Sequence, residues 1–172
     1  MPQPQTFARY VAIGDSSTEG IDDPDGEGGY HGWSQRLAER IDAEQDTNLL
    51  YANLAVRGLN TRQIRERQLE AALAMKPDLA TLFCGTNDVT SPRFDSSAVS
   101  DDIAHMQRTL VDAGATVLSF TLPDLTPLAR LIAPRIAAMN QALNLPDTND
   151  AWRQPFPTAL VQSRAQWCAT EM

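Results

Sequence analysis

Short apolar runs alternate with helix-length amphipathic stretches along most of this chain, and this alternation limits the folds open to it. The runs are rich in β-branched and aliphatic residues, as buried strands are, and they cover residues 9–13, 49–54, 79–83 and 116–120. Strands that alternate with helices form βαβ units. The sequence therefore predicts an α/β fold with a parallel sheet of about four strands.

The stretches between these runs carry apolar residues at helical spacing. Two predicted helices show this clearly, the first with Trp33, Leu37 and Ile41, the second with Val99, Ile103, Met106 and Leu110. The helix between the second and third strands is less regular, and its expected inward residues are Ile64, Leu69, Ala72 and Leu73. A last helix is predicted over 128–143, with Pro134 kinking or dividing it.

The length and the proline distribution set the domain organisation. A chain of 172 residues, 42% of them hydrophobic, is long enough for one domain with its own core. Helical periodicity fades after residue 143, where Pro146, Pro155 and Pro157 lie among polar residues. We predict one α/β domain over 1–143 and an irregular tail over 144–172.

The charge and the composition exclude several classes of partner. A formal net charge of -8 disfavours both nucleic acid and anionic membranes. Neither a secretory signal nor a membrane-spanning run is recognisable, so a cytoplasmic protein is expected. Cys84 and Cys168 form no disulfide framework, and neither histidine has ligand-type spacing with other metal ligands, so we expect no metal and no cofactor.

Polar clusters follow three of the four predicted strands. They are Gly14-Asp15-Ser16-Ser17, the turn that ends at Gly58, and Gly85-Thr86-Asn87-Asp88. Ligands of parallel sheets bind at the carboxyl ends of the strands, so these clusters should share one edge. Ser16 offers a hydroxyl on a strand-to-helix turn, Gly58 a backbone N–H that can approach a ligand closely, and Asn87 a side-chain amide donor.

With these residues in place, the chain resembles the SGNH hydrolases, the GDSL-type esterases and lipases. Gly14-Asp15-Ser16-Ser17 is similar to their nucleophile block, with Ser17 where leucine is usual. The stretch from Asn53 to Gly58 is similar to the block of the oxyanion glycine, and the cluster from Gly85 to Asp88 matches the asparagine block. The resemblance covers about residues 9–143.

The resemblance carries specific implications for fold and chemistry. It implies a three-layer α/β/α sandwich of the flavodoxin-like type that hydrolyses small-molecule esters, whether acyl, acetyl or thioester. It implies Ser16 as nucleophile and the Ser16 N–H, the Gly58 N–H and the Asn87 amide as the oxyanion hole. Gly14, Asp15, Gly85, Thr86 and Asp88 are implied as supporting residues.

The fourth block of the family, Asp-x-x-His near the C-terminus, is not found in this sequence. None of the late carboxylates, Asp147, Asp150 and Glu171, is followed three residues later by histidine. Relative to the family this corresponds to a missing edge strand, helix and triad partners, and the sheet is expected to be truncated at one edge. The general base is therefore unassigned, with His31 as a remote candidate and His105 expected inside a helix.

Other interpretations stay open at this point. Ser16 alone fits a helix cap and Gly58 alone a simple turn, while Asp15 and Asp88 are expected to hold local structure. The acidic residues between 22 and 27 are expected to form a solvated loop. A catalytically inactive pseudoenzyme or ligand-binding module on the same fold is the alternative to a hydrolase, and a nucleotide-binding domain is disfavoured because no phosphate-loop glycine spacing is present. The exposed strand near 116–120 further predicts self-association.

Overall fold

The computed structural model describes residues 6–21, 23–122 and 133–142. Strands and helices alternate through these ranges in the order that the periodicity predicts. The elements are β1 (Arg9–Gly14), α1 (Ser16–Glu19), α2 (Trp33–Glu44), β2 (Leu50–Asn53), α3 (Thr61–Ala74), β3 (Leu79–Phe83), α4 (Thr86–Val89), α5 (Ser96–Asp112), β4 (Thr116–Ser119) and α6 (Ala133–Ala142).

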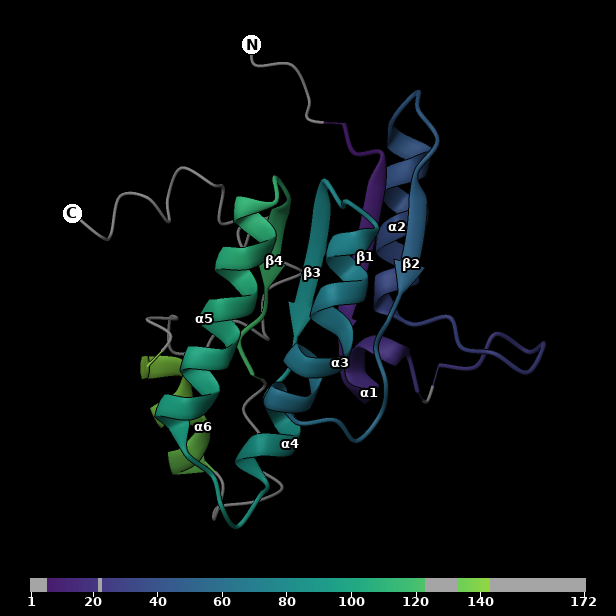
Figure 1. The fold of residues 1–172 in the computed structure, drawn as a ribbon. Helices are drawn as coiled ribbons and strands as arrows, with labels where there is room; N and C mark the ends of the chain where they lie inside the picture. The colour runs from purple at the N-terminus through teal and green to yellow at the C-terminus, as the bar shows by residue number, and fades with distance from the viewer. Residues whose placement is uncertain (1–5, 22, 123–132, 143–172) are drawn as a thin grey trace.

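The four strands form one parallel sheet in the order β2-β1-β3-β4. Figure 1 shows α3 and α5 on one face of this sheet and α2 on the other, which gives three layers. The short helices α1 and α4 lie beyond the ends to which β1 and β3 point (Figure 1). The predicted α/β/α architecture is confirmed, and each predicted strand lies within one residue of the observed one.

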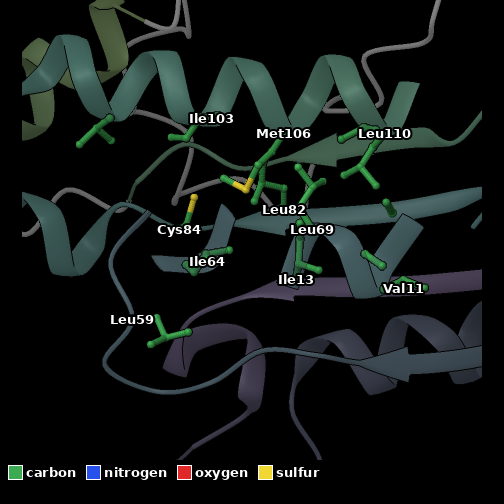
Figure 2. Close-up of a cluster of buried hydrophobic side chains, with 14 of the residues drawn as sticks. Val11, Ile13, Leu59, Ile64, Leu69, Leu82, Cys84, Ile103, Met106 and Leu110 are labelled. Atoms are coloured by element: carbon green, nitrogen blue, oxygen red, sulfur yellow. The ribbon is translucent and has the colours of Figure 1, made fainter. Parts of the chain in front are cut away.

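The main core lies between the sheet and the helices α3 and α5. Figure 2 shows Ile103, Met106 and Leu110 of α5 directed at Leu82 of β3. All four predicted core residues of α5 are buried, as are three of the four predicted for α3, with Leu73 only partly buried. Cys84, which follows β3, is buried in the same core.

The opposite face of the sheet is covered by α2 in a different way. The predicted stripe of Trp33, Leu37 and Ile41 is only half-buried, whereas Ser34 and Ala38 are buried. The two small residues thus form the most buried line of α2, and the larger apolar residues beside it are only partly buried. The prediction therefore identified the correct helix but not the residues of that helix that are most buried.

The helix boundaries follow local signals. Helix α3 ends at Ala74, before Pro77, and Asp95 caps α5 by accepting hydrogen bonds from the backbone of Ser97 and Ala98. Pro134 lies in the first turn of α6, where a missing N–H costs nothing. Helix α6 packs beside α5 (Figure 1). The predicted helical residues 128–132 and the predicted tail lie outside the described residues.

No helix in the described part of the chain has the length and apolar character needed to cross a membrane.

The outer strand β4 generates a prediction about assembly. Within the described sheet β4 pairs with β3 alone, and edge strands are templates for pairing between copies. We expect the sedimentation coefficient to rise with protein concentration. A constant monomer value over a wide concentration range, with a cooperative thermal melt, would contradict self-association through this edge.

Candidate active site at the carboxyl edge of the sheet

Three polar segments meet at the carboxyl edge of the sheet. Helix α1 follows β1 after one residue, α4 follows β3 after Cys84 and Gly85, and residues 54–60 form the turn between β2 and α3. Ser16 is the first residue of α1 and Asn87 the second of α4. The parallel register of β1 with β2 and β3 brings these segments to the same end of the sheet.

The turn into α1 is held by Asp15. Its side chain is almost wholly buried and accepts a hydrogen bond of 3.0 Å from the backbone N–H of Ser17, which makes it the N-cap of α1. The expected structural role of Asp15 is thus visible in the geometry. Ser16 itself is half-buried, and no described side chain forms a hydrogen bond with its hydroxyl.

Close packing fixes the end of β1 just before Ser16. A β-carbon on Gly14 would overlap the carbonyl oxygen of Phe83 and the hydroxyl of Thr18, so only glycine fits there. Gln68, a buried residue of α3, binds the same residue at two points. Its Oε1 accepts from the Gly14 N–H at 2.9 Å and its Nε2 donates to the Gly14 carbonyl at 2.9 Å.

The turn that carries Gly58 is anchored on both sides. Gly58 has a φ of +77°, a left-handed conformation that favours glycine. On one side the Arg57 N–H donates to Glu19 Oε2 at 2.6 Å, and on the other the Leu59 carbonyl accepts from Asn87 Nδ2 at 2.9 Å. The Leu59 side chain is buried in the main core (Figure 2).

Asn87 therefore joins the Gly58 turn to α4. Its amide nitrogen uses one hydrogen for the Leu59 carbonyl and lies 3.5 Å from Asp15 Oδ2, at the limit of a hydrogen bond. The second N–H of Asn87 is thus only weakly engaged by the protein.

Asp88 secures the same helix to the start of α3. Its Oδ2 accepts from the backbone N–H of Thr61 at 2.9 Å and from the Thr61 hydroxyl at 2.8 Å, which confirms the expected structural role.

Burial raises the pKa of the nearby Cys84 thiol far above its usual value, so this cysteine stays protonated and is a poor nucleophile.

The two site carboxyls share an electrostatic character. Burial raises the pKa of Asp15, against hydrogen bonding with Ser17, and the charge of Asp88 raises it further. Burial also raises the pKa of Asp88, and its hydrogen bonds with Thr61 partly offset this. The folded site therefore disfavours the ionised forms of both side chains.

Neither histidine forms a hydrogen bond with Ser16, although both are described. Nε2 of His31 lies 2.8 Å and 2.9 Å from the two carboxylate oxygens of Glu39. His105 is exposed in the middle of α5. The structure does not bring His31, the remote candidate for the base, into a hydrogen bond with the nucleophile.

The remaining polar residues near the site have structural partners. Asp25 accepts from the backbone of Glu27 and Gly29, while Asp23 pairs with Arg36 at 2.8 Å. Trp33 donates from Nε1 to the Ser17 carbonyl at 2.8 Å. The described residues contain no group of three or more side chains able to hold a metal.

The sequence comparison places most of this chain in one family. The model of the GDSL-like lipase/acylhydrolase family matches residues 12–146, which include all three polar segments of the site. The chain belongs to the GDSL-like lipase/acylhydrolase family. A comparison with curated proteins found no match.

Several solved structures share the fold. The lipase Lip_vut3 from a goat rumen metagenome has a TM-score of 0.65 at 19% identity, covering 83% of this chain and 77% of its own. The acetylxylan esterase Axe2 from Geobacillus stearothermophilus has a TM-score of 0.63 at 17% identity, covering 90% and 84%. TesA has a TM-score of 0.60 at 23% identity, covering 80% and 75%. Family and fold together support a GDSL-type hydrolase of esters.

Several residues of this GDSL site had no recognisable signal in the sequence. Glu19 and Gln68 are ordinary polar residues, and Arg57 lies in the stretch from Asn53 to Gly58 without a role of its own in that pattern. Their contacts join segments 38 to 54 residues apart. Only Thr61 had a local hint, because Asn60 and Gln63 form a capping box that marks the start of α3.

Replacing Gln68 tests how the nucleophile strand is held. Gln68→Leu keeps the volume but removes both bonds to Gly14, leaving a buried N–H without a partner. We expect the free energy of unfolding in a urea titration to fall by about 1–3 kcal/mol. Glu70→Ala, an exposed change on the same helix, is the control and should leave stability almost unchanged. Equal stability of both variants would show that the Gln68 bonds contribute little.

Asp15→Asn tests the electrostatics of the turn. A raised pKa means that the stabilising contribution of Asp15 is complete below the usual value of 3.8 and is lost as the pH rises through the raised pKa. The stability of the wild type relative to Asp15→Asn should therefore fall from acid to neutral pH in urea titrations. Asp25→Asn is the opposite case, because the backbone N–H groups of Glu27 and Gly29 lower the pKa of Asp25. A relative stability of Asp15→Asn that does not vary with pH would be inconsistent with this assignment.

Proposed function

We propose that this protein hydrolyses small-molecule carboxylic esters through Ser16. The proposal rests mainly on one observation, the set of hydrogen-bond donors at the carboxyl edge of the sheet. Within the described residues neither the Ser16 N–H nor the Gly58 N–H has a hydrogen-bond partner, and the Asn87 amide keeps one N–H weakly engaged. Such donors are what a developing oxyanion requires.

The chemistry follows from these groups. The Ser16 hydroxyl oxygen attacks the ester carbonyl, whose oxygen becomes negatively charged in the tetrahedral intermediate. The Ser16 and Gly58 N–H groups and the Asn87 amide stabilise that charge. Ser16 loses its proton to solvent, the alcohol of an ester or the thiol of a thioester leaves after taking up a proton from solvent, and water then hydrolyses the acyl-serine. Acyl, acetyl and thioester substrates all present the same carbonyl to this site.

Proton transfer is the step for which the described residues offer no group. The hydroxyl proton of Ser16 must leave during attack, and His31 is bound to Glu39 instead. In a serine protease, loss of the base costs a factor on the order of 10⁶ in kcat, while oxyanion stabilisation and binding retain roughly 10³-fold over water. We therefore expect slow turnover.

The same observation favours a second candidate function. A pocket that retains oxyanion donors without a base can hold a carboxylate or an acetyl group and not cleave it, as a pseudoenzyme or small-ligand binding module would. Thermal stabilisation by acetate or short esters without turnover, unchanged in Ser16→Ala, would support this alternative. The cytoplasmic location, and the exclusion of nucleic-acid and membrane partners, stay predictions.

A fluorophosphonate probe tests the hydrolase directly. We expect the wild type to form one covalent adduct that peptide mass spectrometry places on Ser16, and to hydrolyse short p-nitrophenyl esters slowly. Ser16→Ala should form no adduct and should reduce hydrolysis to the buffer rate, because the attacking oxygen is gone.

Two variants serve as controls for this experiment. Ser17→Ala removes the neighbouring exposed hydroxyl, and His31→Ala removes the remote candidate base; both should keep the adduct. An adduct that survives in Ser16→Ala would place the nucleophile elsewhere. Loss of activity in His31→Ala would make that histidine the base after a rearrangement away from Glu39.

A further inference from the structure

The carboxylate of Glu19 connects the helix that begins with Ser16 to the turn that carries Gly58. Glu19 is the last residue of α1. It accepts from the Arg57 backbone N–H at 2.6 Å and from the Arg57 side chain at 2.8 Å from Nη2 and 3.1 Å from Nε. One side chain thus binds both the main chain and the guanidinium of the residue directly before Gly58.

The guanidinium part of this contact resembles many surface ion pairs. The side chains of Arg57 and Glu19 are 52% and 23% exposed, and pairs of this kind contribute little to stability. Arg57 also lies over the Tyr30 ring, with its Cζ 5.4 Å from the ring centre. The bond to the Arg57 N–H is different in kind, because it fixes the backbone.

Gly58 depends on such anchors more than most residues do. It is exposed, it has no side chain, and a β-carbon built on it would meet nothing within 4 Å. Side-chain packing therefore cannot hold it in place. The backbone of Arg57 is bound to Glu19 on one side, and the carbonyl of Leu59 is bound to Asn87 on the other.

We propose that Glu19 is a positioning residue that sets the distance between the Ser16 hydroxyl and the Gly58 N–H. The proposal rests on the function proposed above, since it assigns Glu19 to the oxyanion donor of that site. Ser16 and Glu19 are the two ends of one four-residue helix. The hydrogen bond between Glu19 and the Arg57 N–H therefore couples the position of the Gly58 turn to that of Ser16. Its essential part is the backbone bond, and the ion pair is secondary.

Three variants separate these two parts. Glu19→Ala removes both, Glu19→Gln keeps an acceptor for the Arg57 N–H, and Arg57→Ala keeps the backbone bond while removing the guanidinium. Arg36→Ala is the matched control, because it breaks an exposed bidentate pair with Asp23 that does not reach the turn.

Steady-state hydrolysis of p-nitrophenyl acetate gives the first readout. We expect Glu19→Ala to lower kcat about tenfold or more with KM within about twofold, because a misplaced oxyanion donor is missed only in the transition state. Glu19→Gln and Arg57→Ala should keep most of kcat, and Arg36→Ala all of it. Equal losses in Glu19→Ala, Glu19→Gln and Arg57→Ala would overturn the proposal in favour of a simple ion pair.

Hydrogen exchange of the wild type and variants gives a readout that needs no turnover. Amides of residues 55–59 should exchange faster in Glu19→Ala than in the wild type, and at the wild-type rate in Arg36→Ala. Unchanged exchange in Glu19→Ala would overturn the proposal.

If the wild type shows neither turnover nor a Ser16 adduct, the proposed hydrolase fails while exchange still decides whether Glu19 holds the turn. Should Glu19→Ala fail to melt cooperatively, wild-type-like exchange in Glu19→Gln supports the backbone bond and fast exchange refutes it.

Discussion

Close approach at Gly14 is the constraint on which the rest of the site depends. Strand β1, the end of β3 and helix α1 meet there, with Phe83 O and the Thr18 hydroxyl in the space that a β-carbon would need. Gly14 fits there because it has no side chain. The buried amide of Gln68 forms hydrogen bonds with both its N–H and its carbonyl. Ser16 follows two residues later as the first residue of α1, and its carbonyl accepts a hydrogen bond from the Gly20 N–H at 3.2 Å.

The two helices that carry Ser16 and Asn87 are four residues long, too short to be stable by themselves. Their order comes from bonds to neighbouring elements. Helix α4 is held to α3 through Asp88 and to the Gly58 turn through Asn87, while α1 is held to that turn through Glu19. Hydrogen bonds thus connect the three segments that carry Ser16, Gly58 and Asn87.

The sequence predicts the sheet and the main helices because periodicity is a local property. The apolar spacing of α5 is sufficient to identify all four of its core residues. It fails for α2, where Ser34 and Ala38 are the buried residues, since small side chains give no hydrophobic signal even where they allow the closest packing. A pattern of hydrophobicity cannot distinguish a helix that packs closely from one that packs through large side chains.

The candidate site divides in the same way. Ser16, Gly58 and Asn87 are found by pattern, because each follows a strand and belongs to a short block with a family counterpart. Gln68 and Glu19 were not found, since a glutamine or a glutamate on a helix is ordinarily a solvated residue. Their partners are 54 and 38 residues away in the sequence, and only the fold brings them together.

Charge stabilisation and proton transfer are separable parts of acyl-transfer chemistry, and the hydrolysis proposed above needs both. Oxyanion donors act on any ligand with negative charge at the right place, whereas attack on an ester also needs a group that accepts the Ser16 proton. The Asp15 carboxyl is already engaged in capping α1, where it accepts a hydrogen bond from the backbone N–H of Ser17. The proposed donors can therefore bind a ligand that is already negatively charged, such as a carboxylate, without any proton transfer. Hydrolysis of an ester also requires a group that accepts the Ser16 proton.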